Sequence, residues 1–122
     1  MILADTSVWV DHLRARDPSM DRLLLADEIA MHPFVLGEVA LGHLNPRKAI
    51  LDMLRRLPSA ERAEDEEVVE FIDRYQLFGT GLGYVDVHLL TGAALSFCAI
   101  WSRDKRLRAV AETLGIAAKG LN

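Results

Sequence analysis

Short apolar runs alternate with longer segments of helical periodicity along this chain. The runs at residues 1–4, 28–32 and 97–101 are too short for helices and predict buried strands. Apolar positions spaced three and four residues apart predict helices between and after these strands. The helices are expected at residues 6–13, 17–26, 33–44, 47–57, 61–77, 84–95 and 104–115, with a brief strand at 116–118.

Polar and small residues mark the ends and the contact faces of these helices. Thr6 or Ser7 is expected to cap the first helix, because a hydroxyl can accept a hydrogen bond from a free backbone N–H there. Asn45 and Pro46 are expected to end the third helix, since proline cannot continue it. The small residues at 92–94 predict a close approach by another backbone segment.

The alternation of short apolar strands with helices predicts an α/β fold, in which a short central parallel sheet is flanked by helices on both faces. With 122 residues and a hydrophobic content of 51%, the chain can form one domain over residues 1–122. Ligands of such sheets bind at the carboxyl ends of the strands. Asp5 and Asp104 each follow a predicted strand, so both are expected at that edge.

Composition narrows the classes of function. No apolar run reaches the roughly 18 residues that a membrane span needs, and residues 1–10 lack the basic leader of a secretory signal. Cys98 is the only cysteine, which excludes an intrachain disulfide and disfavours a thiolate zinc site. We therefore expect a soluble, cytoplasmic protein that does not bind a membrane.

Charge is distributed unevenly along the chain. The formal net charge is −4, but residues 61–74 alone carry −5, so the remainder is close to +1. The acidic segment is expected to be the solvated face of a helix. The basic segment around Asp104 offers candidate contacts to a phosphate backbone. These candidates are Arg103, Lys105, Arg106 and Arg108.

Four carboxylates stand in locally apolar surroundings: Asp5, Glu38, Asp86 and Asp104. For Glu38 or Asp86 alone, a solvated position on a helix is the simpler interpretation. The set of four favours a shared site, because carboxylates that lie close together repel one another unless a cation compensates them. Oxygen-only ligands are typical of Mg²⁺ or Mn²⁺ sites.

Four segments occur in order along the chain: LADTSVW, FVLGEVALG, GYVDVHLL and IWSRDKRL. Together they resemble the PIN-domain ribonucleases, and specifically the VapC-type toxins of bacterial toxin–antitoxin pairs. The resemblance implies a PIN-like fold in which Asp5, Glu38, Asp86 and Asp104 are the catalytic, metal-binding set, with Mg²⁺ as cofactor and Mn²⁺ as a substitute. It also implies supporting roles beside that set for Thr6 and Ser102.

The resemblance further implies an activity and partners. The activity is metal-assisted endonucleolytic hydrolysis of RNA, leaving a 5′ phosphate and a 3′ hydroxyl. The partners are the RNA substrate, a cognate VapB-type antitoxin, and a second copy of the chain in a homodimer that forms a heterotetramer or larger assembly with the antitoxin. His88 departs from the family pattern, which usually has an aliphatic residue there, so local helix packing is expected to differ.

Three other functions have less support in the sequence. A metal-dependent phosphatase or phosphoacceptor domain needs a second acid beside the first strand, where ADTSVW has only Asp5. A metal-independent ribonuclease would use histidines as general acid and base, but His12, His32, His43 and His88 show no pairing motif. A catalytically inactive PIN-like binding module would be marked by the loss of an acid, and all four acids are present.

Overall fold

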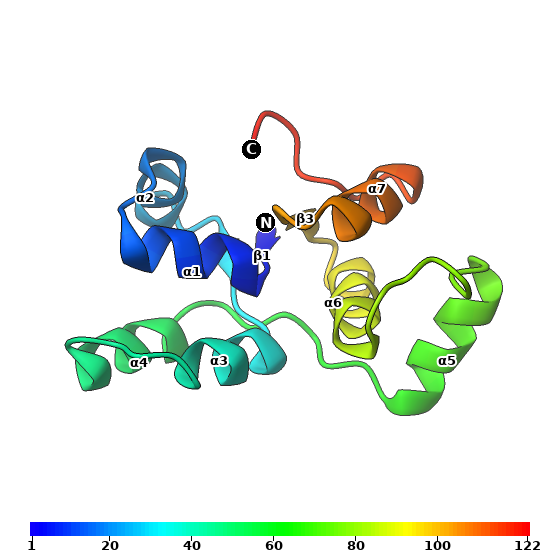
Figure 1. The fold of residues 1–122 in the computed structure, drawn as a ribbon, viewed down its shortest axis with the longest axis horizontal. Helices are drawn as coiled ribbons and strands as arrows, with labels where there is room; N and C mark the ends of the chain where they lie inside the picture. Colours follow the sequence, from blue (N-terminus) through cyan, green and yellow to red (C-terminus); the bar gives the residue numbers. More distant parts are fainter.

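The computed structural model describes residues 1–122 and contains three short strands and seven helices. The strands are β1 (Ile2–Ala4), β2 (Ile29–Ala30) and β3 (Ala99–Trp101). The helices are α1 (Thr6–Arg14), α2 (Pro18–Leu25), α3 (Pro33–Ala40), α4 (Arg47–Arg55), α5 (Asp65–Arg74), α6 (Tyr84–Leu95) and α7 (Lys105–Thr113). Figure 1 shows their arrangement, with α5 packed outside α6 at the edge of the molecule.

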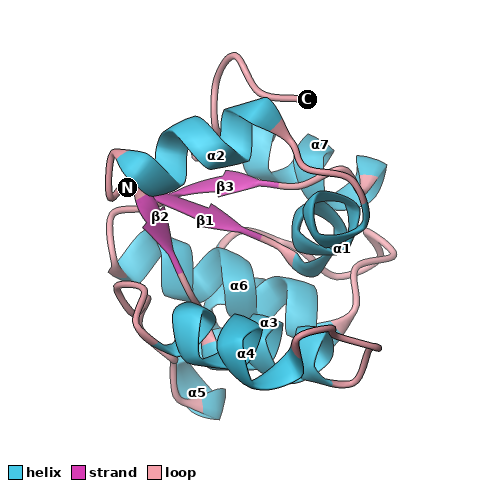
Figure 2. Cartoon of the chain, turned by 90° about the vertical axis from the view of Figure 1, so that its left-hand side faces the viewer, coloured by secondary structure: helices cyan, strands magenta, loops and turns pink.

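The strands form one parallel sheet in the order β2-β1-β3. Leu3 in the central strand pairs with Ala30 on one side and Ile100 on the other. Figure 2 shows α2 and α7 on one face of the sheet and α3, α4 and α6 on the other. The predicted α/β class and the parallel sheet between two helical layers are therefore confirmed.

Helix α6 has the predicted bounds and lies at the centre of the larger helical layer. Its residues 87–93 are all buried, because the helix packs against β3 on one side and α5 on another. At Gly92, an added Cβ would collide with the backbone carbonyl oxygen of Glu61 and press on the ring of His32. The close backbone approach expected at 92–94 therefore occurs at Gly92, where only glycine fits.

Several helix ends differ from the prediction because side chains elsewhere cap them. Helix α1 is capped by Asp5, not by Thr6 or Ser7, since the Asp5 carboxylate accepts hydrogen bonds from the next free N–H groups. Helix α3 ends at Ala40, four residues earlier than expected. There the Arg47 guanidinium donates to the carbonyl oxygen of Ala40 at 2.8 Å and takes over an acceptor that another helical turn would have used.

Two further segments differ in the same way. Helix α5 begins at Asp65 rather than at residue 61, because Glu64 and Glu67 form a reciprocal capping box at that point. The strand expected at 116–118 is a single bridge between Ala117 and Ile100. No helix is long and apolar enough to cross a membrane.

Two histidines are buried between α3 and α6. His32 is fully buried; its Nδ1 accepts a hydrogen bond from the backbone N–H of Phe34 at 3.0 Å, and its Nε2 has no partner. His88 is also buried and lies 3.3 Å from Asp65 through its Nε2. Both imidazoles contact the ring of Phe34 edge to face. His88 therefore packs in the interior against the ring of Phe34, with one ring nitrogen beside Asp65.

Burial lowers the pKa of His32 to about 4, and the nearby His88 and Arg62 add to the effect. An unfolded histidine titrates near pH 6.5. Between pH 4 and pH 6.5 this histidine binds a proton in the unfolded chain but not in the folded chain. The free energy of unfolding is therefore not reduced by His32 above pH 6.5, and it falls as the pH drops below that value. The loss from this residue is about 2 kcal/mol at pH 5.

We expect His32→Asn to flatten this pH dependence, because asparagine can still accept the hydrogen bond from Phe34 but does not titrate. Urea unfolding at pH 7 and pH 5 measures the effect, with His43→Asn at an exposed position as the control. The wild type and the control should each lose about 2 kcal/mol more than His32→Asn over this range. Equal losses in all three proteins would contradict the assignment.

Candidate active site

Asp5 lies where β1 ends and α1 begins, and its side chain is only 6% exposed. One carboxylate oxygen accepts hydrogen bonds from the backbone N–H and the hydroxyl of Ser7. The other accepts a hydrogen bond from the hydroxyl of Ser102 at 2.6 Å. A buried charge is tolerated here because four donors (the two groups of Ser7, the Ser102 hydroxyl and the Val8 N–H) surround it.

Ser102 connects Asp5 to Asp104. Its hydroxyl donates to Asp5 and accepts a hydrogen bond from the backbone N–H of Asp104 at 3.0 Å. Asp104 caps α7 by accepting a hydrogen bond from the N–H of Leu107. Because β1 and β3 are parallel neighbours, their carboxyl ends place both acids at one edge of the sheet.

Helix α3 contributes Glu38, which is exposed and accepts a hydrogen bond from the hydroxyl of Thr6 at 2.9 Å. Because Thr6 directly follows Asp5, this bond holds Glu38 beside the end of β1. The two residues expected to support the acids, Thr6 and Ser102, therefore each bond to one of them.

Helix α6 contributes Asp86 from its first turn. Its carboxylate accepts a hydrogen bond from the N–H of Gly83 at 3.2 Å. Burial raises the pKa of Asp86, and the negative charges of Asp104, Asp5 and Glu38 raise it further. The other three predicted acids therefore lie near enough to Asp86 for their charges to disfavour its ionisation.

No cationic side chain neutralises these acids. All ion pairs of the chain involve other carboxylates, those of Asp11, Asp17, Asp21, Asp52 and Asp65. The donor set is therefore oxygen-only and negatively charged, which fits a hard divalent cation. As the side chains stand, no three of them are close enough to share one metal ion. The set fits such a cation in charge and donor type, and ligation would need the carboxylates to draw together.

The sequence profile of the PIN domain matches residues 2–113, a span that includes all four acids. The chain belongs to the PIN domain family. It is also similar to Ribonuclease VapC32 from two strains of Mycobacterium tuberculosis. In each case the identity is 45% over 118 residues, which cover 96% of this chain and 95% of the relative. The predicted family is confirmed.

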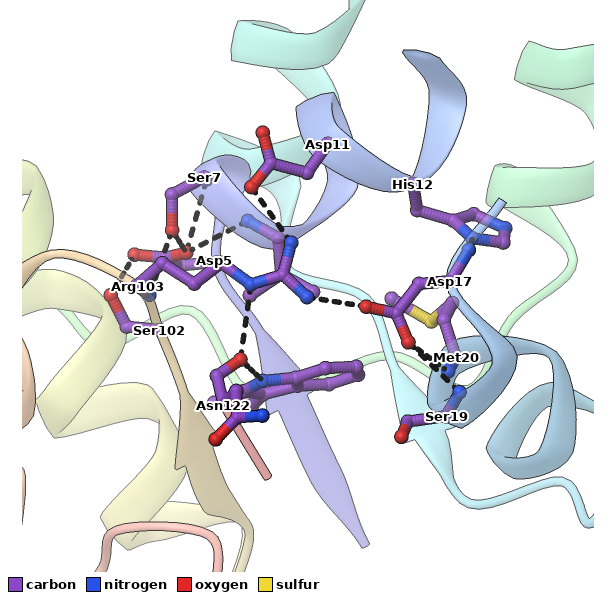
Figure 3. A network of polar contacts seen from close by, with 12 residues as sticks. Asp5, Ser7, Asp11, His12, Asp17, Ser19, Met20, Ser102, Arg103 and Asn122 are labelled. Atoms are coloured by element: carbon purple, nitrogen blue, oxygen red, sulfur yellow. Dashed lines mark hydrogen bonds and ion pairs between the residues drawn. The ribbon is translucent and has the colours of Figure 1, made fainter. Parts of the chain in front are cut away.

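Arg103 takes a different place in this PIN domain from the one expected of an RNA contact. Figure 3 shows its guanidinium between Asp11 and Asp17, with a further hydrogen bond of 3.0 Å to the carbonyl oxygen of Asn122. The hydrogen bond to Asp11 and the pairing with Asp17 raise the pKa of the guanidinium. Two carboxylates offset its charge, so we exclude Arg103 from the candidate RNA contacts.

The backbone of Arg103 belongs to the acidic site even though its side chain points away. Its N–H donates to the hydroxyl of Ser7 at 3.0 Å, and that hydroxyl bonds to Asp5. Arg103 thus ties α1 and the start of α2 to the loop that carries Ser102 and Asp104. Sequence reasoning missed this role and that of Ser7, because neither carries a local signal of its distant partner.

The other three basic candidates lie on α7. Lys105 and Arg108 are exposed and pair with no acid. Arg106 lies against Gly81 in the loop before α6, with its Nη1 3.5 Å from the Gly81 carbonyl oxygen. None of the three pairs with an acid, and Lys105 and Arg108 are the two whose side chains make no hydrogen bond within the protein.

We expect Asp86→Asn to raise the melting temperature of the metal-free protein, because it removes one of four mutually repelling charges. The asparagine can still accept the hydrogen bond from Gly83. The loss of a negative charge at the start of α6 opposes the gain by about 0.3–1 kcal/mol. A net gain of about 1 kcal/mol would raise the melting temperature by about 4 °C.

The same variant should lose most of the stabilisation by Mg²⁺. At ten times its dissociation constant, a bound ion stabilises the wild type by about 1.4 kcal/mol. Thermal melts of both proteins in EDTA and in Mg²⁺ measure both effects, with Asp73→Asn on the exposed face of α5 as the charge-matched control. A variant that melts below the wild type in EDTA and gains equally from Mg²⁺ would make Asp86 a structural acid only.

Proposed function

We propose that this PIN domain is a metal-dependent endoribonuclease, the toxin of a VapC-type toxin–antitoxin pair. One observation carries the proposal: none of the four carboxylates pairs with a cationic side chain, and the charges of the other three raise the pKa of Asp86. The similarity to a ribonuclease over 96% of the chain supports the reaction class.

Asp5, Glu38, Asp86 and Asp104 would hold Mg²⁺, or Mn²⁺ in its place. When bound, the ion supplies a lowered pKa for a water molecule and charge stabilisation at the scissile phosphate. Ser7 and Ser102 hold Asp5 in one orientation through their hydroxyls, and Thr6 holds Glu38. These bonds fix two of the four acids before substrate arrives, which limits the reorganisation needed during reaction.

Two alternatives have less support. A phosphatase or phosphoacceptor domain needs a second acid beside the first strand, and Asp5 is followed there by Thr6 and Ser7. A histidine-based ribonuclease needs accessible imidazoles, and three of the four histidines are buried. His43, the remaining one, has no histidine partner at the surface.

The partners in this proposal are RNA, a VapB-type antitoxin and a second copy of the chain, and the site of action is the cytoplasm. Leu23 of α2 and Leu51 and Leu54 of α4 are buried and are not available to a partner. Leu25 is 88% exposed and remains available for a protein contact.

We expect Asp5→Asn to keep the fold and to abolish RNA cleavage and growth inhibition. Asparagine is a good helix cap, so α1 should still begin at Thr6, whereas a neutral amide binds Mg²⁺ weakly. Cleavage of a labelled RNA by the wild type should stop in EDTA and return with Mg²⁺ or Mn²⁺. Asp73→Asn is the charge-matched control and should cleave normally. Wild-type cleavage at full rate in EDTA would refute the proposal.

Lys105 and Arg108 are expected to contact RNA phosphates beside Asp104. Replacing both with glutamine should weaken RNA binding and lower the slope of log K against log salt by about 1.4, because each lost contact to a single strand is worth about 0.7. The control is Lys48→Gln with Arg55→Gln, which removes the same charge from α4, where Asp52 pairs with both residues. Equal slopes in the two double variants would mean that Lys105 and Arg108 are solvated side chains that do not contact RNA.

A further inference from the structure

A groove of about 350 Å³ lies between α1 and α3 and has Glu38 in its wall. We call it the α1–α3 groove. Apolar side chains line it on both helices, and two basic side chains, Arg14 and His43, complete the lining. The apolar lining residues are Val10, Leu13, Val39 and Leu44.

The helix periodicity explains why the groove starts at the acidic site. Thr6, Val10 and Arg14 follow at intervals of four residues and therefore share one face of α1. Glu38 lies in α3, and Gly42 follows two residues after the end of that helix. Glu38 lines the groove and accepts a hydrogen bond from Thr6, the residue after Asp5, so this part of the groove adjoins the acidic site. From there the groove leads along α1 to Arg14, about 12 Å away at 1.5 Å per residue.

Arg14 is a free cation at the far end of this groove. It is exposed and pairs with no carboxylate, whereas Arg16, two residues later, pairs with Asp21 at 3.1 Å. The opposite wall is held in place by Arg47, whose guanidinium donates to the carbonyl oxygens of Ala40 and Gly42. The groove therefore combines an apolar lining with two charges that form no ion pair, Arg14 and, where it adjoins the acidic site, Glu38.

We propose that the α1–α3 groove binds a nucleotide of single-stranded RNA that lies a few positions away from the bond that is cut. This inference rests on the proposed ribonuclease function and assigns a substrate subsite to it. The ligand must carry an apolar face for Val10 and Leu44 and a negative charge for Arg14, and a nucleotide carries both. The exposed His43 imidazole offers a flat surface on which a base can stack.

Distance determines which nucleotide this is. Stacked nucleotides rise by about 3.4 Å each, and Arg14 lies about 12 Å along α1 from the residue beside Asp5. Arg14 therefore contacts a phosphate about three to four nucleotides from the scissile one, and its role is binding. RNA is favoured over a protein segment as the ligand of this groove. An RNA strand that crosses the acidic site must continue past Glu38, and the groove leads away from that site.

The test compares Arg14→Gln with Arg16→Gln. Each variant removes one positive charge; Arg14 is the last residue of α1, and Arg16 lies two residues beyond it. Cleavage of a short single-stranded RNA of mixed sequence gives KM and kcat for each full-length variant. Anisotropy of the same RNA, labelled with fluorescein, gives its affinity at several KCl concentrations in an Asp5→Asn background. Binding is thus measured where no cleavage occurs.

We expect Arg14→Gln to raise KM about tenfold, to leave kcat within about twofold, and to lower the salt slope by about 0.7. His43→Ala should also raise KM but should leave the salt slope unchanged. Arg16→Gln should match the wild type in all three quantities. This set of results would support the subsite.

Two outcomes would overturn the inference. In the first, Arg14→Gln and Arg16→Gln behave alike while the wild type still cleaves RNA, so that the subsite fails and the ribonuclease function stands. In the second, Arg14→Gln leaves RNA affinity unchanged but prevents copurification with the co-expressed VapB-type antitoxin, so that the groove serves the protein partner. Failure of the ribonuclease function itself is separate, since it appears as a wild type that cleaves no RNA.

Discussion

The rest of the structure depends on one buried carboxylate, that of Asp5. It ends the central strand, caps α1, and accepts hydroxyl hydrogen bonds from Ser7 and Ser102. Ser102 belongs to the segment after β3 and also bonds to the backbone of Asp104. A single charge thus joins β1, α1, β3 and α7. An ionised group in this position is costly without partners, so its hydrogen bonds specify how these four elements meet.

The same charge imposes a constraint on its neighbours. The negative charges of Asp104, Asp5 and Glu38 raise the pKa of Asp86, and no lysine or arginine forms an ion pair with any of the four acids. Arg103 is adjacent to Asp104 in the chain, yet its side chain turns toward Asp11 and Asp17. The lack of an internal ion pair leaves the negative charge for an external cation to offset. This uncompensated charge costs stability in the metal-free state and is the physical basis of the proposed function.

Local patterns were enough to predict most secondary structure, and the errors have specific causes. The apolar segment at 84–95 became α6 without change, because its periodicity and the glycines before it are local signals. The third helix was predicted too long. Arg47, which lies outside the helix, donates a hydrogen bond to the carbonyl oxygen of its last residue, Ala40. The start of α5 was displaced by the capping box of Glu64 and Glu67. In both places the backbone had two ways to satisfy its hydrogen bonds, and periodicity does not distinguish them.

The sequence by itself determined the α/β class, the order of the elements and the PIN-like pattern, and it supplied the four acids as candidates for the site. Each of these depends on residues close together in the chain or on the position of an acid after a strand. Only the tertiary structure decided the partners of those residues. Ser102 bonds to Asp5 across 97 positions, Arg103 reaches Asp17 across 86, and Thr6 meets Glu38 across 32. The α1–α3 groove likewise exists only once two helices pack together. Such contacts form where folding brings distant groups into hydrogen-bonding distance, and helix and strand periodicity carries no information about which distant groups meet.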